Sequence, residues 1–186
     1  GRSGVSGAAA LSLAMPSPRW LLLTGQPGSG KTTAVKSLAL SLQSEGYTLK
    51  GFVTDEVLDS SGSRLGFDVV SFPCGRLRAP LSRKSGPASH PKTGSYSVDV
   101  QSFEGVALPS LGGLDSSDGR HLYVLDEVGR MELHSERFRE RVAELVAGGT
   151  RLIGAVTAPI YGHRVPFCDW LTGLDGVEVM KLTKKS

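Results

Sequence analysis

Short apolar runs alternate with amphipathic stretches along most of the chain. Residues 20–24 are apolar and lead into a glycine-rich turn, a pattern typical of a buried strand. Apolar side chains then recur at helical spacing through residues 31–44, and Gly46 ends the predicted helix. The chain therefore opens with a strand, a tight turn and a helix.

The same alternation continues towards the C-terminus. Residues 56–58 and 65–72 flank a turn at 59–62, which predicts a hairpin. Residues 73–95 hold four prolines and are expected to form a loop. The other predicted strands are 49–54, 96–100, 121–125, 152–157 and 177–182. The other predicted helices are 102–111, a helix capped by Ser135 that runs through Ala147, and a helical turn at 166–171. Strands that alternate with helices indicate an α/β sandwich with a mostly parallel sheet, to which the hairpin adds antiparallel character.

Length and composition bound the class of protein. A chain of 186 residues suits one domain, and its 24 glycines and 10 prolines stay below the level that signals disorder. No apolar run approaches the length of about 18 residues that a membrane span needs, so no membrane partner is expected. The net charge of +3 is too small to indicate nucleic acid. The sequence does not specify the oligomeric state, and a monomer is favoured.

The two ends of the chain and its cysteines bear on processing and compartment. Residues 1–14 are small, lack acidic side chains and are expected to be disordered, as a tag, an upstream extension or a weak organelle-targeting segment. Residues 15–186 are expected to form the single domain. Cys74 and Cys168 are far apart and belong to no CxxC motif, so two free thiols in a reducing, cytoplasmic compartment are expected.

The turn after the first strand carries the strongest chemical signal. Residues 25–32 match the Walker A pattern G-x-x-x-x-G-K-[ST] in full, with a strand before and a helix after. Glycines allow successive backbone N–H groups to point inward at an anion, and the start of the helix favours negative charge. Lys31 is predicted to reach the β- and γ-phosphates, and the Thr32 hydroxyl to bind Mg²⁺.

A second acidic segment supplies the partner that a phosphate loop needs. Four apolar residues, 122–125, precede Asp126 and Glu127 and would place both acids at the carboxyl edge of the sheet, where such sheets bind ligands. Asp126 is predicted to hold Mg²⁺ through a water molecule, and Glu127 is predicted to act as general base or to orient the attacking water.

The motifs leave three classes of function open. An NTP hydrolase would activate water with Glu127, and the pair of acids favours this reading. A small-molecule or nucleoside kinase would use the same phosphate grip but needs a substrate hydroxyl. A non-catalytic nucleotide-binding switch, or a nucleic-acid partner, would bind without turnover.

Eight segments together resemble the THEP1-type nucleoside-triphosphatase family. They are LTGQPGSGKTT at 23–33, GFVTDEV at 51–57, GFDVV at 66–70, PLSR at 80–83, GSYSVDV at 94–100, SFE at 102–104, LDEVGRMEL at 125–133 and GAVT at 154–157. The resemblance implies a RecA-like P-loop fold and slow, Mg²⁺-dependent hydrolysis of ATP, GTP and other NTPs to NDP and phosphate, with little base selectivity.

The resemblance also implies two nucleotide-binding segments. The first comprises Gly25, Gln26, Pro27, Gly28, Ser29, Gly30, Lys31, Thr32 and Thr33. The second comprises Leu122, Tyr123, Val124, Leu125, Asp126, Glu127, Val128 and Gly129.

The sequence departs from the family pattern in two places. Arg130 stands where the family usually has Lys. The chain stops at Thr183–Ser186, where members continue past a Thr-Lys-x-Asn-Arg-like stretch, which leaves a truncated or a divergent C-terminus open.

Three further residues are candidates near the γ-phosphate. Glu56, within GFVTDEV, is expected to order the attacking water. Thr157, at the end of the strand 152–157, is expected to sense the γ-phosphate. For both residues the alternative is a strand end without a functional role. Residues 73–95 carry five basic side chains and no acid, which suggests a basic flap over the phosphates. Arg83, in PLSR, is the first candidate there for an arginine that stabilises the transition state.

Overall fold

The computed structural model describes residues 19–113, 119–159 and 162–184. The predictions for residues 1–14 lie outside these ranges. The strands are β1 (Trp20–Thr24), β2 (Thr48–Leu58), β3 (Arg64–Phe72), β4 (Arg78–Arg83), β5 (Lys92–Thr93), β6 (Tyr96–Val98), β7 (His121–Val128), β8 (Leu152–Val156) and β9 (Val177–Lys181). The helices are α1 (Lys31–Ser44), α2 (Val100–Ser110), the short 3₁₀ helix η1 (Glu132–His134), α3 (Glu136–Ala147) and α4 (Pro166–Thr172).

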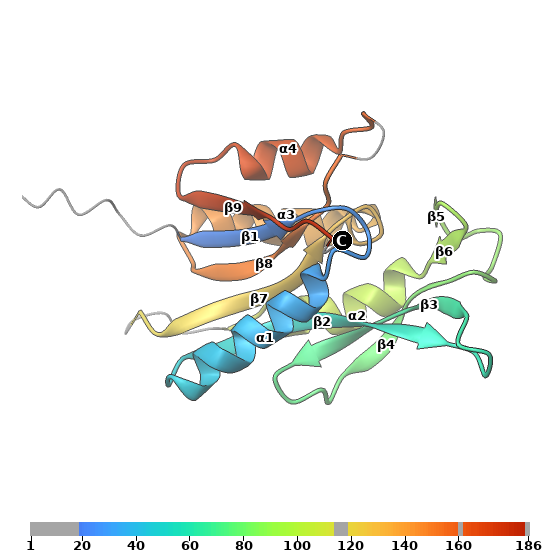
Figure 1. Ribbon diagram of the computed structural model, residues 1–186, viewed down its shortest axis with the longest axis horizontal. Helices are drawn as coiled ribbons and strands as arrows, with labels where there is room; N and C mark the ends of the chain where they lie inside the picture. The colour runs from blue at the N-terminus through green and yellow to red at the C-terminus, as the bar shows by residue number, and fades with distance from the viewer. Residues whose placement is uncertain (1–18, 114–118, 160–161, 185–186) are drawn as a thin grey trace, which may run out of the picture.

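All the strands belong to one sheet in the order β5-β6-β4-β3-β2-β7-β8-β1-β9 (Figure 1). The half from β2 to β9 is parallel, and the half from β2 to β5 is antiparallel. In the parallel half, β8 lies between β1, which leads into the phosphate loop, and β7, which carries the paired acids. The predicted α/β class, with a parallel sheet and an added hairpin, is confirmed.

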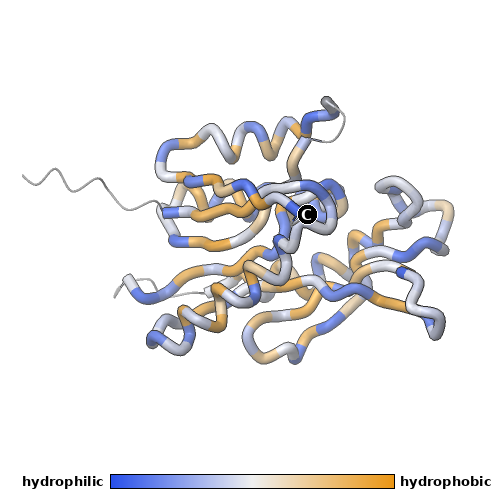
Figure 2. Tube along the Cα trace, in the orientation of Figure 1, coloured by the Kyte–Doolittle hydropathy of each residue, from blue (hydrophilic) through white to orange (hydrophobic). Residues whose placement is uncertain are grey.

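Two apolar cores hold the layers together. On one face of the sheet, α1 buries Val35 and Ala39 against the strands. On the other face, α2 and α3 pack over β2, where Phe52, Phe103 and Phe138 meet edge to face with ring centroids 5.3–5.8 Å apart. Figure 2 shows hydrophobic colouring along the central strands, as expected for strands buried on both faces.

The antiparallel half is larger than the predicted hairpin. Residues 73–95 were expected to form a loop, but they contain β4 and β5. The β3–β4 register shifts opposite Pro80, which pairs with Asp68 while Phe67 pairs with Ser82. A bulge is where a sheet tolerates proline, because proline cannot donate to the ladder. The prolines therefore did not prevent a strand here.

No helix in the described ranges is both long enough and apolar enough to span a bilayer.

Candidate active site

The phosphate loop joins β1 to α1 as the sequence predicts. Gly28 and Gly30 have φ of 78° and 91°, in the left-handed region that side chains with a Cβ rarely adopt. The helix begins at Lys31, so its free N–H groups face the loop. The Lys31 side chain, 11% exposed, folds back over the loop and donates from Nζ to the Gly25 carbonyl at 2.9 Å. A cation and a helix N-terminus thus converge on one concave turn, which suits phosphate.

Asp126 is buried at the carboxyl end of β7. Its side chain is 0% exposed, and Oδ2 accepts hydrogen bonds from the backbone N and from Oγ1 of Thr54 at 2.8 and 2.7 Å. Burial raises the pKa of this carboxyl, while the bonds from Thr54 and the nearby Thr32 hydroxyl oppose the shift. Thr54 lies on the neighbouring strand β2, so the fold positions Asp126 from two strands.

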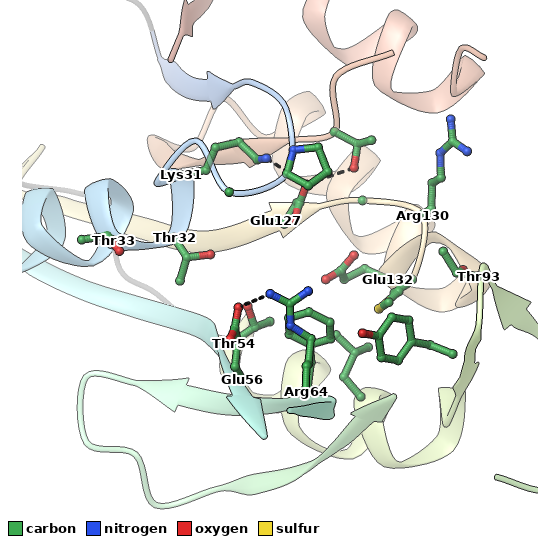
Figure 3. Close-up of a pocket in the computed structure, with 18 of the residues that line it drawn as sticks. Lys31, Thr32, Thr33, Thr54, Glu56, Arg64, Thr93, Glu127, Arg130 and Glu132 are labelled. Atoms are coloured by element: carbon green, nitrogen blue, oxygen red, sulfur yellow. Dashed lines mark hydrogen bonds and ion pairs between the residues drawn. The ribbon is translucent and has the colours of Figure 1, made fainter. Parts of the chain in front are cut away.

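Glu127 comes next in sequence yet also faces the cavity. The register between β7 and β8 shifts between Leu125 and Val128, and such an irregularity re-aims side chains. Its Oε1 accepts from Oγ1 of Thr157 at 3.1 Å and lies 4.0 Å from Lys31 Nζ (Figure 3). Burial raises the pKa of Glu127, and the negative charge of Asp126 adds to this; Lys31 and Thr157 lower it.

The donors beside the loop fit a magnesium ion. Asp126 Oδ1 is buried and has no hydrogen-bond partner within the described ranges, although Oδ2 has two. The Thr32 hydroxyl is close enough to lower the pKa of Asp126. Carboxylate and hydroxyl oxygens, completed by phosphates and water, are what Mg²⁺ prefers. Thr32 and Asp126 therefore form a suitable donor set.

Lys31, Thr32, Glu127 and Thr157 line one cavity of about 490 Å³, and Asp126 is not among its lining residues. The residues from the two predicted nucleotide segments that line it are Pro27, Gly28, Gly30, Lys31, Thr32, Thr33, Glu127 and Gly129. The apolar part of the second segment is placed elsewhere: the side chains of Leu122, Tyr123, Val124, Leu125 and Val128 are buried in the two cores. Those five residues carry the acids to the site, and their side chains pack away from it.

Glu56 and Arg83 have different surroundings. Glu56 lines the cavity, but its half-exposed carboxylate forms an ion pair with Arg64 at 2.6 Å (Figure 3). Arg83 is not among the lining residues; it donates to the Phe67 carbonyl at 2.8 Å and to Asp68 at 2.5 Å. Arg83 thus links β4 to β3 through hydrogen bonds. Arg64, on β3, is the arginine of these two strands that lines the cavity.

Sequence reasoning missed several residues of the site. Thr54 and Arg64 reach the cavity only because β2 and β3 pair beside β7. Glu132 also lines it, at 4% exposed; burial and the charge of Glu127 hold its pKa well above the usual range. Alternate residues of a strand lie on the same face, so an extended β2 would have placed Thr54 and Glu56 together. No sequence motif around Arg64 indicates that it reaches the site.

Gly129 separates the two glutamates. A Cβ at this position would lie 2.8 Å from Thr157 Oγ1 and 2.9 Å from Glu132 Oε2. A side chain there would therefore displace Glu132 and Thr157, and Thr157 is the residue that donates to Glu127. Arg130 and Glu132, which follow, do not pair with one another: Arg130 donates to the His163 carbonyl at 3.0 Å.

Comparison with known proteins places this site in context. A family model described as NTPase matches residues 20–186. The chain is 37% identical over 175 residues to the human cancer-related nucleoside-triphosphatase, covering 90% of each chain. It is 34% identical over 166 residues to nucleoside-triphosphatase THEP1 of Thermotoga petrophila, covering 89% of this chain and 85% of the relative.

Two solved structures share the fold. The solution structure of the human cancer-related nucleoside triphosphatase superposes with a TM-score of 0.75 at 37% identity, over 90% of each chain. The crystal structure of THEP1 from Aquifex aeolicus also gives a TM-score of 0.75, at 30% identity, over 88% of this chain and 90% of that one.

Proposed function

The chain belongs to the NTPase family, and we propose that it hydrolyses ATP, GTP and other nucleoside triphosphates to the diphosphate and phosphate, with Mg²⁺ and with little base selectivity. The observation that carries the proposal is the convergence of Lys31, Thr32 and Glu127 on one cavity, with Asp126 buried behind Thr54. All these groups are suited to contact phosphate, metal or water rather than a base. The triphosphate moiety is the same in every nucleoside triphosphate, so little base selectivity is expected.

The phosphate loop binds and orients the triphosphate. Its backbone N–H groups and Lys31 hold the β- and γ-phosphates. Thr32 and Asp126 would hold Mg²⁺, which when bound would neutralise charge that develops on the phosphate oxygens. Holding the reacting groups in place and matching this charge account for most of the catalysis of phosphoryl transfer.

Glu127 is the proton acceptor of the reaction. Water attacks the γ-phosphorus, its proton passes to a Glu127 carboxylate oxygen, and the bond to the β–γ bridging oxygen breaks, releasing the diphosphate. Thr157, which donates to Glu127 Oε1 at 3.1 Å, orients the carboxylate. Burial raises the pKa of Glu127, which strengthens it as a base towards water.

Arg64 supplies positive charge on the opposite side of the cavity. It is about half exposed and is held by Glu56, so it can reorient towards a bound γ-phosphate without leaving a buried acid unpaired. We assign the stabilisation of transition-state charge to Arg64 in place of Arg83. Glu56 then acts by positioning Arg64.

Steady-state phosphate release from ATP, GTP, CTP and UTP tests this function. We expect release from all four, with kcat/KM values within about tenfold of one another, and loss of release when EDTA removes Mg²⁺. Undiminished release in EDTA would contradict the magnesium site, and turnover of a single nucleotide would contradict broad selectivity.

The cysteines support a reducing, intracellular location. Cys74 is exposed, Cys168 is buried beneath the site, and both are free thiols. Burial raises the pKa of Cys168 to about 12, which keeps it protonated and unreactive.

A further inference from the structure

The cavity continues past Glu127, away from the phosphate loop. This second part, here called the outer compartment, is lined by Phe67, Leu81, Thr93, Tyr96, Arg130 and Met131. Figure 3 shows Thr93 and Arg130 on the far side of Glu132 from Lys31 and Thr32. A hydrogen bond of 2.8 Å between Thr93 and His134 joins the β5–β6 arm to η1 and closes this end.

The walls of the outer compartment are apolar and aromatic. The rings of Phe67 and Tyr96 lie 5.7 Å apart at an interplanar angle of 59°, and Leu81 and Met131 add aliphatic surface. A lytic water needs only polar partners near Glu127. An aromatic wall is instead typical of a pocket that binds an organic molecule, and about 490 Å³ falls within the range of such pockets.

Arg130 provides a polar anchor in the same compartment. Its terminal nitrogen donates to the His163 carbonyl at 3.0 Å, but its Nε is buried and has no partner within the described ranges. A buried donor without a partner is costly, and a ligand acceptor in the compartment would satisfy it. Arg130 lines the same cavity as the aromatic rings, and its unpaired Nε is an observation independent of them.

The γ-phosphate end of the site faces the outer compartment. Lys31 is the residue expected to bind the β- and γ-phosphates, and its Nζ lies 4.0 Å from Glu127 Oε1. The side chains of Glu127 and Glu132 both flank Gly129, and Glu132 lines the same cavity as Met131 and Tyr96. A molecule seated against the rings would therefore lie next to the phosphoryl group that is transferred.

We propose that the outer compartment binds a small organic alcohol with a flat apolar part, and that the enzyme transfers the γ-phosphoryl group to its hydroxyl in competition with water. The proposal rests on the proposed function, since both reactions use the same triphosphate site. The alcohol oxygen attacks the γ-phosphorus and forms the new P–O bond. The hydroxyl proton passes to Glu127, and the bond to the β–γ bridging oxygen breaks with its electron pair on the departing diphosphate.

The test uses ATP with a radioactive γ-phosphate, Mg²⁺, and adenosine, guanosine, cytidine or uridine as the acceptor, because a nucleoside combines a flat base with hydroxyls. Free phosphate and nucleoside monophosphate are separated and counted, with and without acceptor. We expect a labelled monophosphate from at least one nucleoside. Phosphate release without any labelled monophosphate would overturn the transfer and leave hydrolysis standing, whereas neither product would overturn the proposed function as well.

Ring variants locate the acceptor. Phe67→Ala and Tyr96→Ala should each lower the ratio of transfer to hydrolysis by about tenfold, while Tyr96→Phe retains it. Leu65→Ala, on an exposed neighbour of Phe67 that does not line the cavity, is the matched control and should leave the ratio unchanged. A ratio unaffected by loss of either ring would overturn the proposal. The KM for ATP is also measured without added nucleoside. An equal rise in this KM in both alanine variants would overturn the proposal, because the rings would then bind the base of the triphosphate.

Discussion

At the scale of single residues, the site depends on two contacts of the Glu127 carboxylate, with Thr157 and with Lys31. Glu127 is partly buried beside Asp126, with 31% of its side chain exposed; partial burial and the charge of Asp126 raise its pKa, and Lys31 and Thr157 lower it. Burial is the larger effect, so the carboxyl titrates above its usual range while Lys31 limits the shift. A base tuned upward in this way accepts a proton from water more readily.

Replacing Thr157 by Val should move the pH profile. The variant removes the hydrogen bond that lowers the pKa of Glu127, so that pKa rises further. Because the base acts only when deprotonated, activity is lost as the pH falls through this pKa, and the acid limb of kcat shifts to higher pH. A kcat–pH profile of both proteins checks this; a limb that stays in place or moves to lower pH would exclude the Thr157–Glu127 contact from the mechanism.

The residues of the site differ in how far the sequence could predict them. Two local motifs predict four of the candidate residues, because phosphate binding requires certain residue types at a fixed spacing. These residues are Lys31, Thr32, Asp126 and Glu127. Arg64 reaches the cavity through strand pairing between distant parts of the chain, and no local pattern encodes that contact.

At the scale of elements, the β2–β3 hairpin extends the site beyond the phosphate loop. It carries Glu56, Arg64 and Phe67 to the cavity. The sequence predicted this hairpin because turn residues separate two apolar runs. It did not predict β4, since Pro80 and two arginines obscure the strand pattern, and only the bulge and the Asp68 ion pairs make that strand possible.

Two arginine variants separate catalysis from support of the sheet. Arg64→Ala should lower kcat by about tenfold to a hundredfold with little change in KM, because it removes charge directed at the transition state. Arg83→Ala loses its bonds to Asp68 and to the Phe67 carbonyl, so its main effect should be a lower midpoint of thermal unfolding. Steady-state kinetics and thermal melts of both variants measure this. A larger fall in kcat for Arg83→Ala than for Arg64→Ala would reverse the assignment.

At the scale of the whole molecule, alternation of strands and helices was enough to predict the fold class. The order of the strands was not predictable, because periodicity says which face a residue occupies and nothing about which strands are neighbours. β8 lies between β1 and β7, and all three strands contribute side chains to both apolar cores. That placement sets the distance between the phosphate loop and the acids.

The aromatic cluster between the sheet and α3 should dominate stability. Phe138 is fully buried against Phe52 and Phe103, so Phe138→Ala removes both ring contacts and leaves a cavity. We expect a loss of about 3–5 kcal/mol in the free energy of unfolding by urea denaturation. Leu40→Ala, at a side chain 59% exposed on α1, is the control and should cost far less. Equal losses in the two variants would show that the cluster contributes little.

The role of Glu127 as proton acceptor is tested by comparing the wild type with Glu127→Gln in a single-turnover assay. Nucleotide affinity and the rate of phosphate release from Mg²⁺-ATP are measured on the same preparations. We expect the variant to bind ATP within a few fold of the wild type and to release phosphate about two to four decades more slowly, the usual contribution of a positioned proton acceptor. Release at the wild-type rate would show that Glu127 is not the proton acceptor and would contradict the proposed mechanism.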